Sequence, residues 1–332
     1  LSLDLSDLKK VGRPAIMMSC VPASCEILAF FMLAPSLLGV TRIEAAVMGA
    51  VLAAVSPAVV VPRMVRLMDE KYGTKKSIPQ LILAGASCDD IFVIVLFSTF
   101  SGMAQGGHAN VMGFVNIPVS IVLGIALGAA AGFVLSVFFE ISYAHRHCVR
   151  NSVKVIIVLG VSFLLMAVET WLKGIVSVSG LLAVVSMACV IRIRCVPQVT
   201  ARLSEKFGKL WLAAEVILFV LVGAAVDIRY TLEAGIAAVA MIFAALIFRG
   251  IGVSLCLVKT SLSFKERLFC IIAYLPKATV QAAIGSVPLA MGLPCGKIVL
   301  SVAVLAILIT APLGAIGIDS AYKKLLTHDE NS

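Results

Sequence analysis

Two adjacent aspartates, Asp89 and Asp90, interrupt a stretch that is otherwise apolar or weakly polar, between residues 78 and 101. The chain is 61% hydrophobic and 14% charged, with a mean hydropathy of +1.09, which is far more apolar than a water-soluble domain. The stretch is therefore predicted to span a membrane. A charged side chain near the bilayer centre costs on the order of 3 kcal/mol. Two such carboxylates side by side predict an ion pair, an ion-binding site, or both.

Neighbouring residues on a helix point about 100° apart, so Asp89 and Asp90 cannot both face one partner. One of them can pair with Arg249, while the other faces a cavity. Burial and a neighbouring like charge both favour the protonated form of a carboxylate, and adjacent acids titrate as a coupled unit. Such a group can hold either a proton or a dehydrated Na+, with backbone carbonyls, Ser56 and Ser87 as further oxygen ligands. Mutually exclusive occupancy would exchange one for the other.

Apolar windows of about 20 residues predict an all-α polytopic membrane protein with ten spanning helices. The expected spans are residues 14–38, 44–67, 78–101, 112–141, 151–171, 174–194, 210–228, 234–258, 267–291 and 296–319.

The basic residues predict the orientation of these spans. Of the 27 Lys and Arg residues, 21 fall in loops on one side and four on the other, while Arg249 and Lys277 lie inside spans. The positive-inside rule then places both ends of this chain in the cytoplasm. The net charge of +9 is spread over six loops, which favours anionic lipid headgroups over a nucleic-acid partner. A bacterial cell membrane is the expected location.

Prolines punctuate the second and ninth spans. Pro57 and Pro62 lie in the second, and Pro276 and Pro288 in the ninth, and each is expected to kink or break its helix. A tolerated kink is the alternative. The two spans are the middle members of the first and last triplets, and an offset of seven spans inverts one triplet relative to the other. This arrangement predicts inverted-topology repeats with two crossing broken helices, which is typical of secondary transporters.

The deep ionisable residues segregate into these triplets. They are Glu26, Asp89, Asp90, Arg249 and Lys277, whereas Glu169 and Glu215 lie near helix ends, where interfacial placement is expected. Three acids against two bases leave one carboxylate for a cation. The expected organisation is a lead-in (1–13), core repeat 1 (14–101), scaffold and dimerisation helices (112–228), core repeat 2 (234–319) and a cytoplasmic tail (320–332).

Three segments carry a family resemblance: SPAVVVPRM from Ser56, GASCDDIFVIVLF from Gly85 and YLPKATVQAAIGSVPLA from Tyr274. Together they resemble the monovalent cation/proton antiporter superfamily, and within it the Na+/H+ antiporters with an adjacent Asp-Asp motif. The resemblance implies the Na+/H+ antiporter fold, a homodimer with a mobile core and a scaffold, and elevator-like alternating access. It implies a secondary active transporter rather than an enzyme, with no cofactor beyond the transported Na+ or Li+ and H+.

The resemblance also implies roles for single residues. The cation would bind transiently at Asp90, Asp89 would pair with Arg249, and Glu26 would pair with Lys277. Family members usually carry further helices before the point where this sequence starts, so an N-terminally truncated chain is expected. Many bacterial relatives have Lys where this chain has Arg249.

Three other functions remain open from the residues alone. A K+/H+ antiporter would use the same elements, and a sodium-coupled organic-anion symporter can share inverted repeats and broken helices. An intramembrane aspartyl protease also needs paired acids, but with carboxyls about 3 Å apart, usually from two helices.

The small and sulfur-containing residues carry weaker signals. The nine cysteines form no C-x-x-C pair and are interpreted as small hydrophobic residues, so no resident metal is expected. Gly124, Gly128 and Gly132 form a small-residue ladder that predicts close helix packing, either within the monomer or at a dimer contact.

Overall fold

The structure is a computed structural model that describes residues 12–105, 111–144, 150–172, 178, 180–224 and 228–329. The side chains of Ser87, Cys88 and Glu215 lie outside the described part. The chain divides into two compact units, one formed mainly by Gly107–Ile217 and the other by Asp4–Gly106 with Leu218–Ser332. We call them unit 1 and unit 2.

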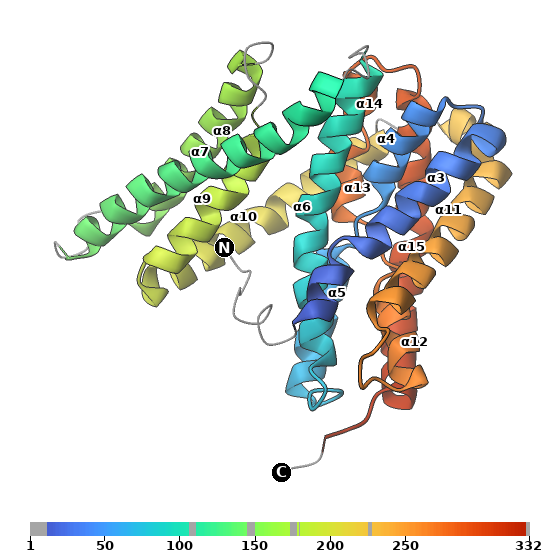
Figure 1. Cartoon of the computed structure of the whole chain (residues 1–332). Coiled ribbons are helices and arrows are strands. Elements are labelled where there is room, and N and C mark those ends of the chain that lie inside the picture. Colours follow the sequence, from blue (N-terminus) through green and yellow to red (C-terminus); the bar gives the residue numbers. More distant parts are fainter. Residues whose placement is uncertain are drawn as a thin grey trace. The chain divides into compact units, whose positions relative to one another are not determined.

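Unit 1 contains three helices and most of a fourth: α7 (Val111–Ala144), α8 (Asn151–Leu172), α9 (Gly180–Arg194) and α10 (Pro197–Ala224). Helix α9 packs along α7 and also against α8 (Figure 1). Their shared core includes Phe139, Leu165 and Met187. Glu169, which was expected at the membrane–water interface, accepts a hydrogen bond from the backbone N–H of Gly180 at 2.9 Å. Its carboxylate therefore satisfies one of the free N–H groups at the start of α9.

Glycines set how closely α7 and α9 approach. A Cβ on Gly128 would lie 2.0 Å from the carbonyl oxygen of Ala183, and one on Gly132 would lie 2.7 Å from that of Met187. The glycine ladder thus packs against α9 inside the chain at these two positions.

We expect Gly128→Ala to destabilise unit 1. The added methyl would clash with the backbone of α9, which cannot move aside as the tip of a flexible side chain could. Overpacking of this kind costs about 1–3 kcal/mol. Thermal unfolding in detergent measures the loss. Gly160→Ala in α8 is the matched control, since a Cβ there meets nothing within 4 Å. Equal stability of the two variants would contradict the packing shown here.

Unit 2 contains the helices of both predicted core repeats. The first set is α2 (Arg13–Met18), α3 (Val21–Leu38), α4 (Arg42–Leu52), α5 (Pro57–Asp69) and α6 (Ile78–Ala104). The second set is α11 (Ile228–Cys256), α12 (Phe264–Ala273), α13 (Thr279–Ile284), α14 (Val287–Ala290) and α15 (Gly296–Leu325). Helix α3 runs beside α11, and α4 lies against α3 and α6 (Figure 1).

The two interrupted spans begin with the same local device. Thr41 and Glu44 form a capping box at α4, and Ser263 and Glu266 form one at α12. In each box a hydroxyl and a carboxylate satisfy free N–H groups of the first turn. Burial raises the pKa of Glu266, but hydrogen bonds from Lys76, at 2.8 Å, and Ser263 outweigh it and leave the pKa below its ordinary value. Each box is followed by a helix of similar length before the break, 11 residues in α4 and 10 in α12.

Both expected breaks are present, but not at every expected proline. Helix α4 ends at Leu52 and α5 begins at Pro57, while Pro276 lies between α12 and α13. Pro288 falls in the first turn of the short α14, just after a second interruption. The expected break at Pro62 is wrong, because α5 continues through it. One proline removes only one N–H donor, and a helix in a membrane protein tolerates that loss when its other turns keep their bonds.

Six segments of the described chain are long and apolar enough to span a membrane: Arg13–Leu38, Arg42–Asp69, Val122–Ile141, Ser152–Leu172, Gly235–Cys256 and Gly296–Leu325. The count of ten spans stays a prediction. Helix α10 starts at Pro197, well before the predicted residue 210. Its first turns carry charged residues that are mostly exposed. These residues have high helix propensity, but their low hydropathy excludes them from a window that searches for apolar spans.

The end of α15 is tied to the loop before α6. This helix continues to Leu325, so part of the expected tail from residue 320 is helical. Thr327 accepts a hydrogen bond from the backbone N–H of Gly73 at 2.9 Å, and the Asp329 carboxylate accepts from Thr74 and from the backbone of Lys75, both at 2.8 Å. The segment that follows α15 is therefore bonded directly to the loop before α6.

Candidate ion-binding site at the two helix breaks

The two interrupted stretches of unit 2 meet. The backbone N–H of Ser56, in the first break, donates to the carbonyl oxygen of Pro276, in the second, at 2.8 Å. Residues 52–56 are buried at this crossing. A helix end leaves several carbonyls without intrahelical partners, and water cannot satisfy them deep in a membrane protein. The chain must supply other donors.

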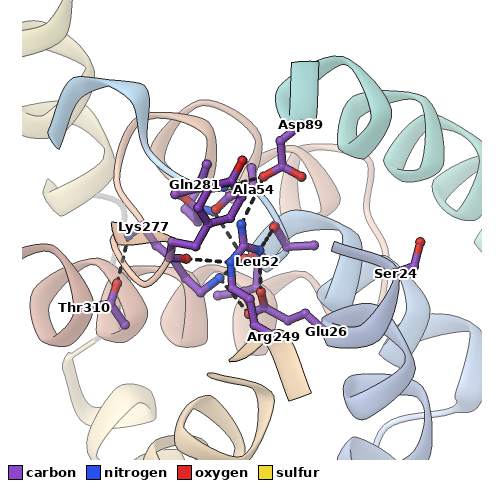
Figure 2. A network of polar contacts seen from close by, with 12 residues as sticks. Ser24, Glu26, Leu52, Ala54, Asp89, Arg249, Lys277, Gln281 and Thr310 are labelled. Atoms are coloured by element: carbon purple, nitrogen blue, oxygen red, sulfur yellow. Dashed lines mark hydrogen bonds and ion pairs between the residues drawn. The ribbon is translucent and has the colours of Figure 1, made fainter. Parts of the chain in front are cut away.

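Side chains from α11, from the second break and from α13 supply them (Figure 2). Lys277 donates from Nζ to the Leu52 carbonyl, and Arg249 donates from Nη1 to the Ala53 carbonyl. The amide nitrogen of Gln281 donates to Ala54, at 2.8 Å, and to Leu52, at 3.3 Å. Two of these donors are cationic, which suits the negative end of the α4 dipole.

Arg249 is fully buried and serves four acceptors. Besides the Ala53 carbonyl it reaches Glu26 Oε2 from Nη1 at 2.8 Å, Asp89 Oδ2 from Nη2 at 3.1 Å and the Tyr274 carbonyl from Nε at 2.6 Å. The Tyr274 ring also lies below the guanidinium, with 5.5 Å from Cζ to the ring centroid. One side chain thus joins α3, α6 and both breaks.

Glu26 is shared between the two bases. Its Oε1 lies 2.6 Å from Lys277 Nζ, and its Oε2 is bound by Arg249. Lys277 is in turn held by its backbone N–H, which donates to Thr310 Oγ1 at 3.0 Å. The structure therefore contains both expected contacts, Glu26 with Lys277 and Asp89 with Arg249. It adds the Glu26–Arg249 pair, which pairwise matching of deep charges does not reveal.

The two aspartates have different surroundings. Asp89 is fully buried, and its Oδ2 accepts from Arg249 and from the backbone N–H of Val55 at 2.9 Å. Asp90 is only partly buried, and within the described part of the chain no base forms an ion pair with it. Among the described residues, the buried oxygens without a hydrogen-bond partner include Asp89 Oδ1, Asp90 Oδ1, Ser56 Oγ and Gln281 Oε1. Oxygens of this kind suit a small hard cation.

Sequence reasoning missed two members of the network, Gln281 and Tyr274. Gln281 is fully buried in the short helix α13, and a polar amide in an apolar stretch was its only signal. Tyr274 follows the last residue of α12 and contributes a backbone carbonyl, for which a sequence gives no signal. The expected ligand Ser87 has a side chain outside the described residues.

Comparison with known proteins agrees with this geometry. A family model described as "Sodium/hydrogen exchanger, transmembrane" matches residues 1–323. The chain belongs to the sodium/hydrogen exchanger family. Human sodium/hydrogen exchanger 9B2 is 33% identical over 342 aligned positions, which cover all of this chain and 62% of that protein. Human sodium/hydrogen exchanger 9B1 is 34% identical over 298 positions, covering 84% of this chain and 55% of that protein.

The fold agrees with the family. The sodium proton antiporter MjNhaP1 from Methanocaldococcus jannaschii superimposes with a TM-score of 0.82 at 22% identity, over 98% of this chain and 81% of that one. The chain is thus a multi-pass integral membrane protein with the Na+/H+ antiporter fold. It spans about three fifths of the length of the 9B2 exchangers, 62% for the human protein.

The network predicts unequal costs for losing its two bases. We expect Arg249→Met to lower stability by roughly 3–5 kcal/mol, because it strands buried carboxylates and carbonyls together. Lys277→Met should lower stability by less. In this variant Glu26 would still pair with Arg249, and the Leu52 carbonyl would still accept a hydrogen bond from Gln281. Thermal unfolding of the purified variants gives the order, with the exposed Lys297→Met as control. The reverse order would show that Lys277 is the centre of the network.

Proposed function

We propose that this chain forms the transport core of a secondary active antiporter that exchanges Na+ or Li+ for H+. The observation that carries the proposal is the buried charge balance at the crossing of the breaks. Arg249 and Lys277 are matched by Glu26 and Asp89, and Asp90 is left without a base among the described contacts. Membership of the sodium/hydrogen exchanger family supports the same activity.

Asp90 is the proposed exchange site. An uncompensated carboxylate inside a membrane protein is costly, whereas a bound proton or a bound Na+ neutralises it. Either occupant therefore permits the site to move between the two sides, and the empty anion does not. Proton and cation compete for the same group, which couples their movements in opposite directions. Asp89 Oδ1 and Ser56 Oγ are the proposed further oxygens for the cation, with Ser87 as a candidate.

Alternating access by an elevator-like movement and a homodimer belong to this proposal, with unit 1 as the scaffold and dimerisation unit. Unit 1 exposes large apolar side chains on α8 and α10, among them Phe163, Leu212 and Val216. Such surfaces face lipid or a second copy of the chain. The cytoplasmic position of both ends and a bacterial cell membrane likewise remain predictions.

A K+/H+ antiporter would use the same site with a different cation. Two other activities account for the site less well. A sodium-coupled symporter for organic anions would not need a surplus carboxylate at Asp90. An aspartyl protease would require the two carboxyls to share a proton. Here Asp89 Oδ2 is already engaged by Arg249 and Val55.

We expect Asp90→Asn to abolish exchange while the protein still folds, because an amide keeps the shape but can neither release a proton nor neutralise a cation. Proteoliposomes loaded with a pH-sensitive dye and given Na+, Li+ or K+ gradients measure this, with an organic-anion uptake assay alongside. Asp69→Asn, at an exposed position at the end of α5, is the control. Undiminished Na+-driven proton flux in Asp90→Asn would refute the site, and flux only with K+ would identify the K+/H+ alternative.

The same site predicts the charge moved per cycle. A guanidinium effectively never loses its proton in a protein, so Arg249 can hold Asp89 ionised throughout. Asp90 then carries the only exchanged proton, and we expect one proton per Na+ with no net charge. Exchange should not respond to an imposed membrane potential, and Arg249→Lys should retain some activity and acquire voltage dependence. Strong acceleration of the unmodified protein by a potential would mean that a second group, Asp89 first, also titrates.

A further inference from the structure

Gln281 is a buried polar side chain to which the exchange mechanism above gives no role. It is fully buried in α13, and its Nε2 donates to the Ala54 carbonyl at 2.8 Å and to the Leu52 carbonyl at 3.3 Å (Figure 2). These acceptors fix the orientation of the amide, since the reverse orientation would set Oε1 against two carbonyl oxygens. Oε1 is thereby left buried without a hydrogen-bond partner among the described residues. Such exceptions are rare, so a role beyond stability is indicated.

The Ala54 carbonyl is the acceptor that depends on Gln281. Leu52 also accepts from Lys277 Nζ, so its carbonyl keeps a donor without the amide. The Ala54 carbonyl has no second donor within the described part of the chain. It also lies outside both helices, because α4 ends at Leu52 and α5 begins at Pro57. The orientation of this carbonyl is therefore set by one hydrogen bond, from Gln281.

The peptide that joins Ala54 to Val55 is bonded to Gln281 through its carbonyl and to Asp89 through its N–H. The Val55 N–H donates to Asp89 Oδ2 at 2.9 Å. The peptide is trans, so its carbonyl and its N–H point in opposite directions. A hydrogen bond to the carbonyl also polarises the peptide and strengthens its N–H as a donor. Gln281 therefore acts on Asp89 through a single peptide unit.

The same peptide affects the position of Ser56, the next residue. The Ser56 N–H donates to the Pro276 carbonyl at 2.8 Å, while its Oγ is buried without a hydrogen-bond partner among the described residues. A rotation of the peptide at Ala54 would move Ser56 and would turn the Val55 N–H away from Asp89. Both further oxygens proposed for the cation, Asp89 Oδ1 and Ser56 Oγ, thus depend on the orientation of this peptide.

We propose that Gln281 is a positioning residue for cation binding. By holding the peptide between Ala54 and Val55, it keeps Ser56 Oγ and Asp89 Oδ1 in place for a cation at Asp90. A dehydrated cation needs several oxygens at once, whereas a proton needs only the one carboxylate. Gln281 therefore sets how tightly the cation binds rather than how fast the loaded site moves. This inference rests on the proposed exchange function.

Gln281→Met tests the role because it keeps the length of the side chain and removes the donor. We expect the Na+ concentration for half-maximal exchange, measured in proteoliposomes at one fixed pH, to rise about tenfold, the effect of losing one hydrogen bond. The maximal rate should stay within about twofold of the unmodified rate. The rise in unfolding temperature on adding Na+ should require a correspondingly higher Na+ concentration, and this readout does not depend on transport.

Ile318→Ala is the matched control for lost stability. Ile318 is buried in α15, eight residues and so about 12 Å along the helix from Thr310, which binds the Lys277 backbone. Its truncation should lower the unfolding temperature and leave the half-saturating Na+ concentration unchanged. A lower maximal rate of Gln281→Met at an unchanged half-saturating concentration would overturn the inference, because it would show a purely structural role.

Gln281→Asn decides the question if Gln281→Met does not fold. Its amide is one methylene further from Ala54, so we expect the half-saturating Na+ concentration to rise in this variant too. An Asn variant with the Na+ dependence of the unmodified protein, in exchange and in thermal unfolding, would then refute the role of Gln281. Absence of both Na+-driven proton flux and Na+-induced stabilisation in the unmodified protein would instead refute the proposed function.

Discussion

A helix that stops in the middle of a membrane protein leaves backbone carbonyls that water cannot reach. The buried charges of unit 2 are arranged around the need to supply hydrogen-bond donors to these carbonyls. Helix α4 stops at Leu52, and the carbonyls of residues 52–54 accept from Lys277, Arg249 and Gln281. Two of these donors are charged, so they require buried counter-charges. Glu26 and Asp89 supply them, and that pairing leaves Asp90 as the surplus acid. The proposed ion site is thus a consequence of how the break is stabilised.

The two breaks have similar starts but different partners. Both follow a capping box with a hydroxyl and a glutamate. In the second break the Tyr274 carbonyl accepts from Arg249, and the Pro276 carbonyl accepts from the backbone of Ser56. The first break therefore depends on side-chain cations, and the second partly on the backbone of the first. Both bases of this network, Arg249 and Lys277, come from the second repeat, while the acids that pair with them, Glu26 and Asp89, come from the first. Each repeat alone would leave its buried charges unmatched.

The sequence alone predicted those features that depend on one residue and its neighbours along the chain. Hydropathy located the helices, prolines marked the breaks at Pro57 and Pro276, and the rarity of charge in apolar spans identified Glu26, Asp89, Asp90, Arg249 and Lys277. Prediction from the sequence failed for features that depend on contacts between segments far apart in the chain. Pro62 does not interrupt α5, and Arg249 serves two acids rather than one. Gln281 and Tyr274 were overlooked because their roles depend on the groups that they contact only after folding, the Leu52 and Ala54 carbonyls for Gln281 and Arg249 for Tyr274.

A buried network of this size is not explained by stability. Replacing buried ion pairs with well-packed apolar residues is often neutral or stabilising, so charge is an expensive way to close a helix break. Neutral donors could satisfy the same carbonyls, as Gln281 does at Leu52 and Ala54. Neutral donors could not hold Asp89 as an anion beside Asp90, which the proposed mechanism requires. In that mechanism a fixed negative neighbour favours any positive occupant of Asp90, proton or metal cation alike, and so keeps the two in competition. The proposal thus gives the charges at the break a role in making Asp90 responsive to both ions.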